Sequence, residues 1–179
     1  MTEQTAPPVL VIMGVSGCGK TTIAQLLSQQ FGWEYAEGDA MHPQVNVDKM
    51  ASGHPLTDED RWPWLQVVAG WIRGKVEAGE PGIVTCSALK RSYRDVLRGE
   101  NVVFVYLKGS RELIARRLAE RHGHFMPPAL LDSQLATLEE PGPDERAVTV
   151  EITGEPPQTL VAVLEALDGT VSRCGGAAS

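Results

Sequence analysis

The hydrophobic residues of this chain fall into short continuous runs that alternate with longer stretches of helical spacing. The short runs, which are rich in β-branched residues, predict strands at 9–13, 34–36, 83–86, 102–107 and 147–152. The helical spacing predicts helices over 21–31, 64–76, from Ser110 to about residue 121, and over 157–167. Because the runs lack regular polar alternation, we expect strands that are covered on both faces. The pattern therefore predicts an α/β fold, a three-layer sandwich with a mostly parallel five-stranded sheet, in a single domain over 1–179.

Three long segments do not fit this sheet, and the first two of them leave the predicted carboxyl ends of strands. They cover residues 38–61, 87–94 and 122–143. Ligands of open parallel sheets bind beyond the carboxyl ends of the strands. We therefore expect function to reside there, with 38–61 as a substrate-binding insertion and 122–143 as a lid. The two ends, 1–7 and 169–179, are rich in small and polar residues and are predicted to be disordered.

Between the first predicted strand and the first predicted helix, residues 14–21 read GVSGCGKT, which fits the phosphate-binding pattern G-x-x-x-x-G-K-[ST]. Glycines allow the positive φ angles that turn successive N–H groups toward a phosphate, and the following helix directs its positive end at the anion. We expect Lys20 to reach the β- and γ-phosphates and the Thr21 hydroxyl to bind Mg²⁺. The residues expected to bind ATP are Gly14, Ser16, Gly17, Cys18, Gly19, Lys20, Thr21 and Thr22.

Two acidic residues, Glu37 and Asp39, close the second predicted strand. Residues two apart in a strand point to the same side, so both carboxylates can face a triphosphate and its metal. No hydrophobic run of the chain ends in a further metal-binding aspartate, which leaves Thr21, Glu37 and Asp39 as the predicted Mg²⁺ ligands, Glu37 through water or directly. Asp39 is the predicted catalytic base toward a substrate hydroxyl; if proton removal is late, it chiefly orients that hydroxyl.

Charge and composition narrow the class of partner. The formal net charge of −7 argues against nucleic acid, and no apolar run reaches the length of a membrane span. Three widely spaced cysteines form neither a disulfide framework nor a zinc pattern, and the first residues lack the features of a secretion signal, so we expect a cytoplasmic protein. Cys18, inside the phosphate-binding loop, is either sensitive to oxidation or a small residue at a variable position.

Read together, the motifs of this chain resemble those of the gluconate kinases, small P-loop enzymes related to shikimate and nucleoside monophosphate kinases. The likeness covers roughly 9–157 and rests on GVSGCGKT at 14–21, GDAMHP at 38–43, KMASGHPLTDEDRWPWL at 49–65, CSALKRSYRDVLR at 86–98, VYLKG at 105–109, RLAERHGHFM at 117–126 and LDSQLATLEEP at 131–141. The resemblance implies a nucleoside-monophosphate-kinase-like P-loop fold, a reaction of ATP with D-gluconate that gives 6-phospho-D-gluconate, and a homodimer.

A polyol that carries one carboxylate needs a fixed cation and several hydrogen-bonding side chains. Arg61, Lys90 and Arg94 are the predicted cations for the carboxylate or the transferred phosphoryl group, and His42 is predicted to bind hydroxyls. The cations have alternatives: Arg61 can pair with Asp58 or Asp60, and Lys90 and Arg94 lie at the spacing of a solvated helix face.

The predicted lid begins next to two arginines. Arg117 and Arg121 lie one helical turn apart, so both can cover the triphosphate and stabilise the charge that develops during phosphoryl transfer. With Lys20 and Asp39 they form the predicted catalytic set. His124 and Gln134 are predicted to contact substrate when the lid closes, or else to belong to the structure of the lid.

Two other functions remain open from the sequence alone. One is a kinase for another small hydroxy acid, such as shikimate, because the loop and lid are shared among these enzymes. The other is a nucleotide-dependent switch without a small acceptor, against which stands the lack of an N-K-x-D guanine-reading segment.

Overall fold

Five parallel strands form the centre of the molecule in the computed structural model, which describes residues 7–120 and 128–174. The strands are β1 (Val9–Met13), β2 (Tyr35–Glu37), β3 (Gly82–Thr85), β4 (Val102–Lys108) and β5 (Ala147–Glu151). Their order across the sheet is β2-β3-β1-β4-β5. The central strand β1 pairs in parallel with β3 on one side and with β4 on the other. The predicted α/β fold is confirmed, and the sheet is parallel throughout.

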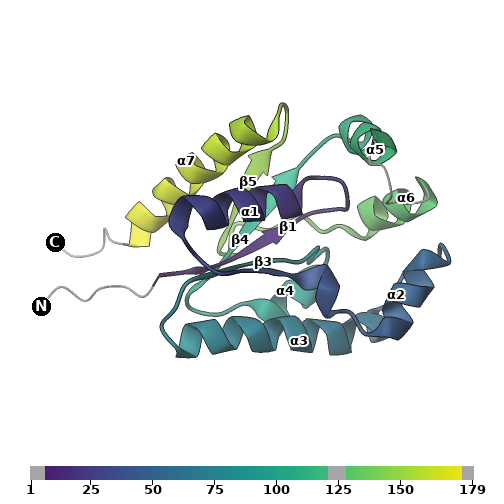
Figure 1. The fold of residues 1–179 in the computed structure, drawn as a ribbon, viewed down its shortest axis with the longest axis horizontal. Helices are drawn as coiled ribbons and strands as arrows, with labels where there is room; N and C mark the ends of the chain where they lie inside the picture. Colours follow the sequence, from purple (N-terminus) through teal and green to yellow (C-terminus); the bar gives the residue numbers. More distant parts are fainter. Residues whose placement is uncertain (1–6, 121–127, 175–179) are drawn as a thin grey trace, which may run out of the picture.

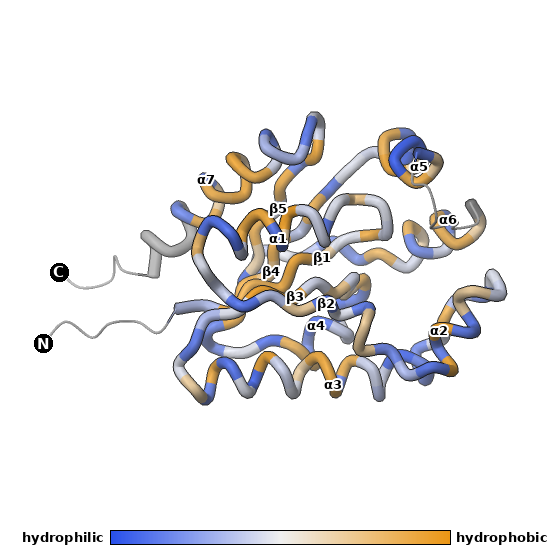
Figure 2. The backbone as a smooth tube through the Cα atoms, in the orientation of Figure 1, coloured by the Kyte–Doolittle hydropathy of each residue, from blue (hydrophilic) through white to orange (hydrophobic). Residues whose placement is uncertain are grey.

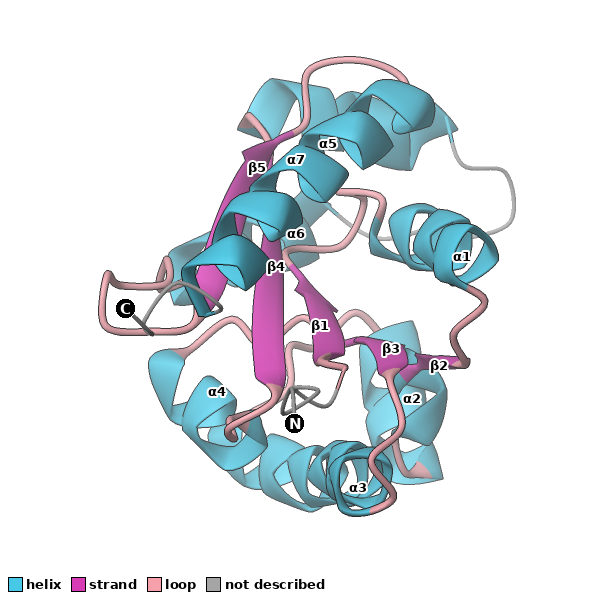
Figure 3. Cartoon of the chain, turned by 90° about the vertical axis from the view of Figure 1, so that its left-hand side faces the viewer, coloured by secondary structure: helices cyan, strands magenta, loops and turns pink. Residues whose placement is uncertain are grey.

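Helices cover both faces of the sheet (Figures 1 and 3). On one face lie α1 (Lys20–Phe31) and α7 (Pro156–Cys174), and on the other α3 (Asp58–Glu77) and α4 (Arg91–Leu97). Near the carboxyl edge of the sheet lie a 3₁₀ turn (Gly38–Met41), α2 (Gln44–Ala51), α5 (Arg111–Glu120) and α6 (Pro128–Thr137). The beginning of β1 and the end of α7 lie on the opposite side of the molecule, away from the segments in which we expected function.

The core is the sheet itself together with the helix faces packed on it. Every residue of β1 is buried, as are the first six of β4, in agreement with apolar runs that lack alternation. In Figure 2 these strands form the hydrophobic centre of the molecule. Burial of both faces makes the sheet a rigid base for the loops that leave its carboxyl edge.

The helices differ from the prediction mainly in the polar segments. Helix α3 begins at Asp58, six residues before the predicted start, because Thr57 and Asp60 form a capping box that the sequence analysis missed. Pro63 consequently lies within the helix. Helices α2, α4 and α6 were not predicted; they are short, and α2 buries a single residue, so their hydrophobic periodicity is weak.

The ends of the chain also differ in part. Helix α7 continues to Cys174, beyond the predicted end at 167, so the prediction of disorder is wrong for residues 169–174. Residues 1–6, 121–127 and 175–179 lie outside the described part of the chain, and 122–127 of these belong to the predicted lid.

Candidate active site

The phosphate-binding loop connects β1 to α1 in a conformation that requires glycine. Gly14 has φ +141°, and a Cβ added there would lie 2.8 Å from Cys18 Sγ and 2.9 Å from the carbonyl oxygen of Leu107. Gly19, with φ +95°, is the N-cap of α1. Positive φ at these positions turns the loop back on itself and leaves the first N–H groups of α1 without helical acceptors. The predicted anion-binding geometry is present at this end of α1.

Lys20 is held within the loop that precedes it. Its side chain is nearly buried, and its ammonium donates hydrogen bonds of 2.9 Å to the Gly14 carbonyl and 3.1 Å to the Val15 carbonyl. An ammonium group has three N–H donors, so these two bonds orient it and leave one donor for a phosphate oxygen. Thr22, by contrast, is exposed in the first turn of α1.

Cys18 is fully buried beneath the loop. Burial raises the pKa of its thiol, although Lys20 and Arg117 act in the opposite direction. Because the thiolate is the reactive species, a buried thiol with a raised pKa is inert. Of the two interpretations of Cys18, the structure favours the small packing residue over the oxidation site.

Glu37, at the end of β2, accepts hydrogen bonds from three hydroxyl groups. Its carboxylate accepts from Thr21 Oγ1 at 3.0 and 3.1 Å, from Thr85 Oγ1 at 2.7 Å, and from the Tyr35 hydroxyl. Burial, together with the neighbouring Glu37 carboxylate, raises the pKa of Tyr35, which keeps this phenol protonated as a donor. The predicted Mg²⁺ ligands Thr21 and Glu37 are thus in direct contact, and Asp39 follows them, exposed, in the 3₁₀ turn.

The donor set matches the requirements of Mg²⁺. This ion prefers oxygen ligands and is held by one or two carboxylates together with phosphates and water. Glu37 and Asp39 supply carboxylates and Thr21 a hydroxyl, next to a loop built for phosphate. These residues fit Mg²⁺ carried in by a nucleotide, whereas no cluster of three or more His, Cys, Asp or Glu suited to a tightly held metal occurs in the described residues.

A second cluster of charge lies where α3 begins and α4 begins. Arg61 Nη1 donates 2.8 Å to the Tyr93 hydroxyl, and that hydroxyl donates to Asp58. Lys90 Nζ lies 3.0 Å from Asp58 Oδ1, and both cations also lie near the face of the Tyr93 ring. Hydrogen bonds from Tyr93 and Lys90 lower the pKa of Asp58. One carboxylate thus faces two cations, so the cluster keeps a positive excess.

Neither alternative pairing of Arg61 appears as a direct ion pair: Asp60 pairs with Lys49 at 2.7 Å, and the Tyr93 hydroxyl lies between Arg61 and Asp58. Tyr93, the residue that joins Arg61 to Asp58, was missed by the sequence analysis. Its position three residues after Lys90, on the same face of a helical segment, was the available signal.

Arg94 is the clearest correction to the predicted site. Its side chain is 1% exposed and forms a bidentate ion pair with Glu145, with 2.6 Å from Nε to Oε1 and 3.1 Å from Nη2 to Oε2. Nη1 donates to the carbonyls of Ala88 and Leu89. The prediction that Arg94 binds substrate or phosphate is therefore wrong, because its donors are used inside the protein.

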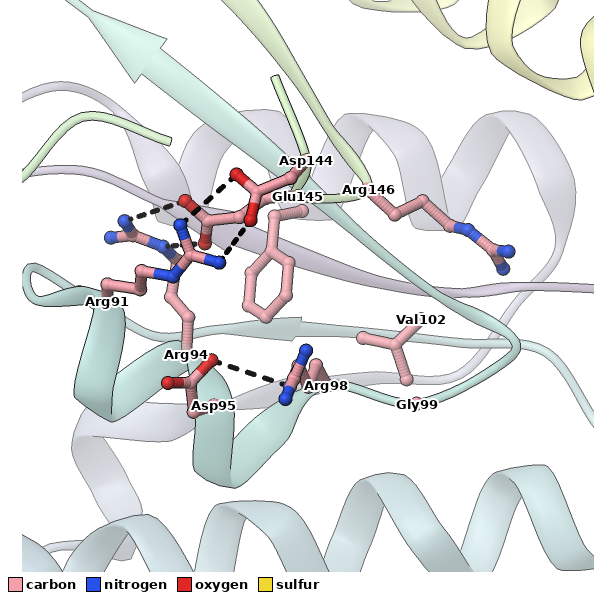
Figure 4. Close-up of a pocket in the computed structure, with 10 residues that line it drawn as sticks. Arg91, Arg94, Asp95, Arg98, Gly99, Val102, Asp144, Glu145 and Arg146 are labelled. Atoms are coloured by element: carbon pink, nitrogen blue, oxygen red, sulfur yellow. Dashed lines mark hydrogen bonds and ion pairs between the residues drawn. The ribbon is translucent and has the colours of Figure 1, made fainter. Parts of the chain in front are cut away.

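Figure 4 shows this pair at the wall of a cavity of about 450 Å³ beside α4. Arg91 pairs there with Asp144, and Arg98 with Asp95. The cavity is lined by α4, the first half of β4 and residues 144–146, and it includes no residue of the phosphate-binding loop.

His42 follows the 3₁₀ turn and is half-buried. Its ring stacks on Trp64 with 4.0 Å between ring centroids, and Trp64 Nε1 donates 2.8 Å to the Gly38 carbonyl. Burial lowers the pKa of His42 to about 4, although Asp39 pulls the pKa upward. The ring is therefore uncharged at neutral pH. His42 and Asp39 lie on the same short segment after β2, and Trp64 of α3 contacts that segment at the Gly38 carbonyl and at the His42 ring.

The described lid-side residues contact the phosphate-binding loop. Arg117 Nη2 donates 2.7 Å to the Gly154 carbonyl, and a Cβ added at Gly19 would lie 3.5 Å from Arg117 Nη1. Gln134 of α6 accepts from Ser16 N at 2.8 Å and donates to Ser16 Oγ at 3.2 Å. Arg121 and His124 lie outside the described residues. Gln134 thus lies on the nucleotide side of the site in this structure.

Comparison with known proteins agrees with this arrangement. Residues 9–141 match the model of the AAA domain family. The gluconokinase of Gluconobacter oxydans is 55% identical over 146 residues, which cover 80% of this chain and 82% of that protein. The thermoresistant gluconokinase of Escherichia coli is 42% identical over 86% of this chain and 89% of its own length.

No helix among the described residues has both the length and the apolar character needed to cross a membrane.

Solved structures show the same relationship. The crystal structure of a gluconokinase from Sinorhizobium meliloti superimposes with a TM-score of 0.87 at 41% identity, over 96% of this chain and 97% of that chain. An unliganded sugar kinase from Janibacter gives a TM-score of 0.84 at 49% identity, over 90% and 95% of the two chains. Identity and coverage of this extent, on a phosphate-binding loop of intact geometry, place the chain in the gluconokinase family of P-loop kinases.

Proposed function

We propose that this protein transfers the γ-phosphoryl group of ATP to D-gluconate and releases ADP and 6-phospho-D-gluconate. The observation that carries the proposal is the placement of two sites at one edge of the sheet. The phosphate-binding loop follows β1, Lys90 and Tyr93 follow the neighbouring strand β3, and Arg61 reaches Tyr93 from the first turn of α3. An anionic nucleotide and an anionic acceptor can therefore be bound side by side.

The charge of the acceptor cluster suits a carboxylate. The protein as a whole is acidic, with a formal net charge of −7, so binding of a small anion depends on a local excess of cations. Arg61 and Lys90 outnumber Asp58, and Arg presents paired donors that match a carboxylate. We assign the carboxylate of gluconate to Arg61 and Lys90, and its hydroxyls to His42 and Asp39.

In the proposed reaction a hydroxyl oxygen of gluconate attacks the γ-phosphorus, and the bond from that phosphorus to the β–γ bridging oxygen breaks. The hydroxyl proton passes to the Asp39 carboxylate, or Asp39 orients the hydroxyl until the proton leaves late in the transfer. Lys20, with its free N–H beside the loop, neutralises negative charge on the phosphates. Most of the catalysis is positioning and charge stabilisation.

Mg²⁺ belongs to this proposal. Thr21, Glu37 and Asp39 would hold it beside the nucleotide, with Glu37 acting directly or through water. When bound, the ion neutralises charge on the β- and γ-phosphates. In the structure Glu37 already orients the Thr21 hydroxyl, which keeps the side chains close together before the ion arrives.

We further propose that Arg117 and Arg121 cover the triphosphate and that residues 122–143 act as a lid, with His124 near the acceptor. Closure would exclude water, which competes with gluconate for the phosphoryl group. Two parts of the proposal rest on family resemblance and composition: a homodimer, and a cytoplasmic location without nucleic acid or membrane partners. The free, buried Cys18 and Cys86 are compatible with a reducing compartment.

The decisive experiment measures ADP release from Mg-ATP in a coupled assay with four acceptor conditions: D-gluconate, shikimate, a set of nucleoside monophosphates, and no acceptor. Stimulation by gluconate alone supports the proposal. Stimulation by shikimate would indicate that the protein is a kinase for another small hydroxy acid. Turnover that is independent of any acceptor would indicate a nucleotide switch.

A further inference from the structure

Helix α2 is mostly solvent-exposed, yet the one residue that it buries is polar. Asn46 is 2% exposed, while its neighbours Val45 and Val47 are 69% and 41% exposed. Burying an amide in place of these valines is unfavourable unless the amide is fully hydrogen-bonded. The orientation of α2 therefore serves the contacts of Asn46 rather than apolar burial.

The contacts of Asn46 determine how its amide is oriented. Nδ2 lies 2.8 Å from the carbonyl oxygen of Asp60 and 3.2 Å from His42 Nδ1. A backbone carbonyl only accepts hydrogen bonds, so the NH₂ group, and not the amide oxygen, must face Asp60. The same NH₂ group then directs its second N–H at His42 Nδ1.

A nitrogen that receives an N–H cannot carry a proton itself. His42 Nδ1 is therefore the acceptor, and the single proton of the neutral ring resides on Nε2. Stacking on Trp64, itself 1% exposed and bonded to the Gly38 carbonyl, fixes the plane of the ring. Among the residues that the structure describes, none hydrogen-bonds to Nε2. This N–H remains as a donor next to the segment that carries Asp39.

We propose that Asn46 is a positioning residue that locks His42 in the Nε2–H form, so that His42 Nε2 donates a hydrogen bond to an oxygen of the sugar acid. The identity of that acceptor rests on the proposed function; the protonation state of His42 does not. His42 is then neither a base nor a cation in the reaction. It selects acceptors that present an oxygen lone pair at this point.

The charged groups around the ring are consistent with this state. Asp39 favours the imidazolium, whereas burial and Arg61 disfavour it, and burial is the largest influence on the pKa of His42. An uncharged donor avoids competing with Arg61 for the substrate carboxylate.

The first test is ¹⁵N NMR of histidine-labelled full-length protein without substrate at pH 7. The chain has four histidines, so the His42 signals are identified by their loss in His42→Asn. We expect a protonated Nε2 and an unprotonated Nδ1. A protonated Nδ1, or an imidazolium, would overturn the proposal without any reference to gluconate. This measurement needs only the wild-type protein and the assignment variant.

The second test compares Asn46→Ala with Gln44→Ala, a control that removes an exposed amide from the same helix. Asn46→Ala should populate both tautomers and raise KM for gluconate about tenfold, the loss of one oriented hydrogen bond, with KM for ATP within about twofold. Asn46→Ser, which keeps one donor, should recover part of the loss. An unchanged tautomer in Asn46→Ala would refute the role of Asn46.

The two tests separate this proposal from the proposed function. If wild-type protein shows the Nε2–H form but does not phosphorylate gluconate, the proposed function fails and the assignment of Nε2 to a sugar acid fails with it. If gluconate is phosphorylated but the proton lies on Nδ1, the proposed function stands, whereas both the role of Asn46 and the donation by His42 Nε2 are wrong.

Discussion

Replacing Arg94 with methionine tests whether this arginine supports the fold or binds substrate. Methionine keeps much of the buried volume but removes every donor. It leaves the Glu145 carboxylate, whose side chain is 10% exposed, without its charged partner, and the Ala88 and Leu89 carbonyls without a donor. Removing one member of a buried ion pair costs about 3–5 kcal/mol.

The lower part of that range applies here, because Glu145 still accepts a hydrogen bond of 2.8 Å from Gly142 N. For a chain of this length, 1 kcal/mol changes the melting temperature by about 2–4 °C. We therefore expect Arg94→Met to lower Tm by roughly 6–12 °C at pH 7. Calorimetry and urea unfolding measure the change directly.

Arg91→Met is the matched control, since Arg91 forms the adjacent pair with Asp144 in which both side chains are about half exposed. Solvent screens such a pair, and Tm should hardly change. The double variant Arg94→Met with Glu145→Leu should regain much of the lost stability, because it removes the unpaired buried charge together with its cause.

The pH dependence gives a further check. In the folded protein, the hydrogen bond from Arg94 lowers the pKa of Glu145. The stabilisation from this pair is therefore present above the unfolded-state pKa of about 4.3 and is lost as the pH falls through the lower folded-state pKa. The difference in stability between wild type and Arg94→Met should shrink in that acidic range. A variant with unchanged Tm and a raised KM for gluconate would refute the structural role and restore the substrate role.

Four further experiments test the remaining assignments. Asp39→Asn should lower kcat about 10²- to 10⁴-fold while ATP affinity, measured by titration, stays close to wild type; near-normal turnover would exclude its role. Glu37→Gln should raise the Mg²⁺ concentration at half-maximal turnover about 10- to 100-fold. Gly38→Ala places a Cβ 1.8 Å from the Thr85 carbonyl oxygen and should cost about 3 kcal/mol or more in urea unfolding, whereas Gly70→Ala, which meets nothing within 4 Å, should not destabilise. In a Cys174→Ser background a thiol reagent at pH 8 should label neither Cys18 nor Cys86 until the protein unfolds, because burial raises both pKa values; rapid labelling of the native protein would contradict this.

The sequence alone was sufficient wherever chemistry is local. The phosphate-binding loop was identified because its glycines, Lys20 and Thr21 are consecutive, and their spacing is set by the backbone of one turn. The strands β1, β3 and β4 were found because both of their faces are buried, which produces continuous apolar runs; β2 and β5, at the edges of the sheet, are only partly buried. The two-residue period of a strand was the basis for pairing Glu37 with Asp39, but β2 ends at Glu37 and Asp39 lies in the 3₁₀ turn, so the shared orientation of the two carboxylates stays a prediction.

Tertiary structure decided which polar side chains face outward and which face one another. Arg94 and Lys90 are both cations at helical spacing in the sequence. In the structure Arg94 is paired with Glu145, 51 residues further along the chain, whereas Lys90 lies near the surface beside Asp58. The state of His42 likewise depends on Asn46 and Trp64, which pack against it from two different helices. Residue type and local spacing determine the chemistry that a segment can offer, whereas burial and long-range partners determine which groups remain free to perform it.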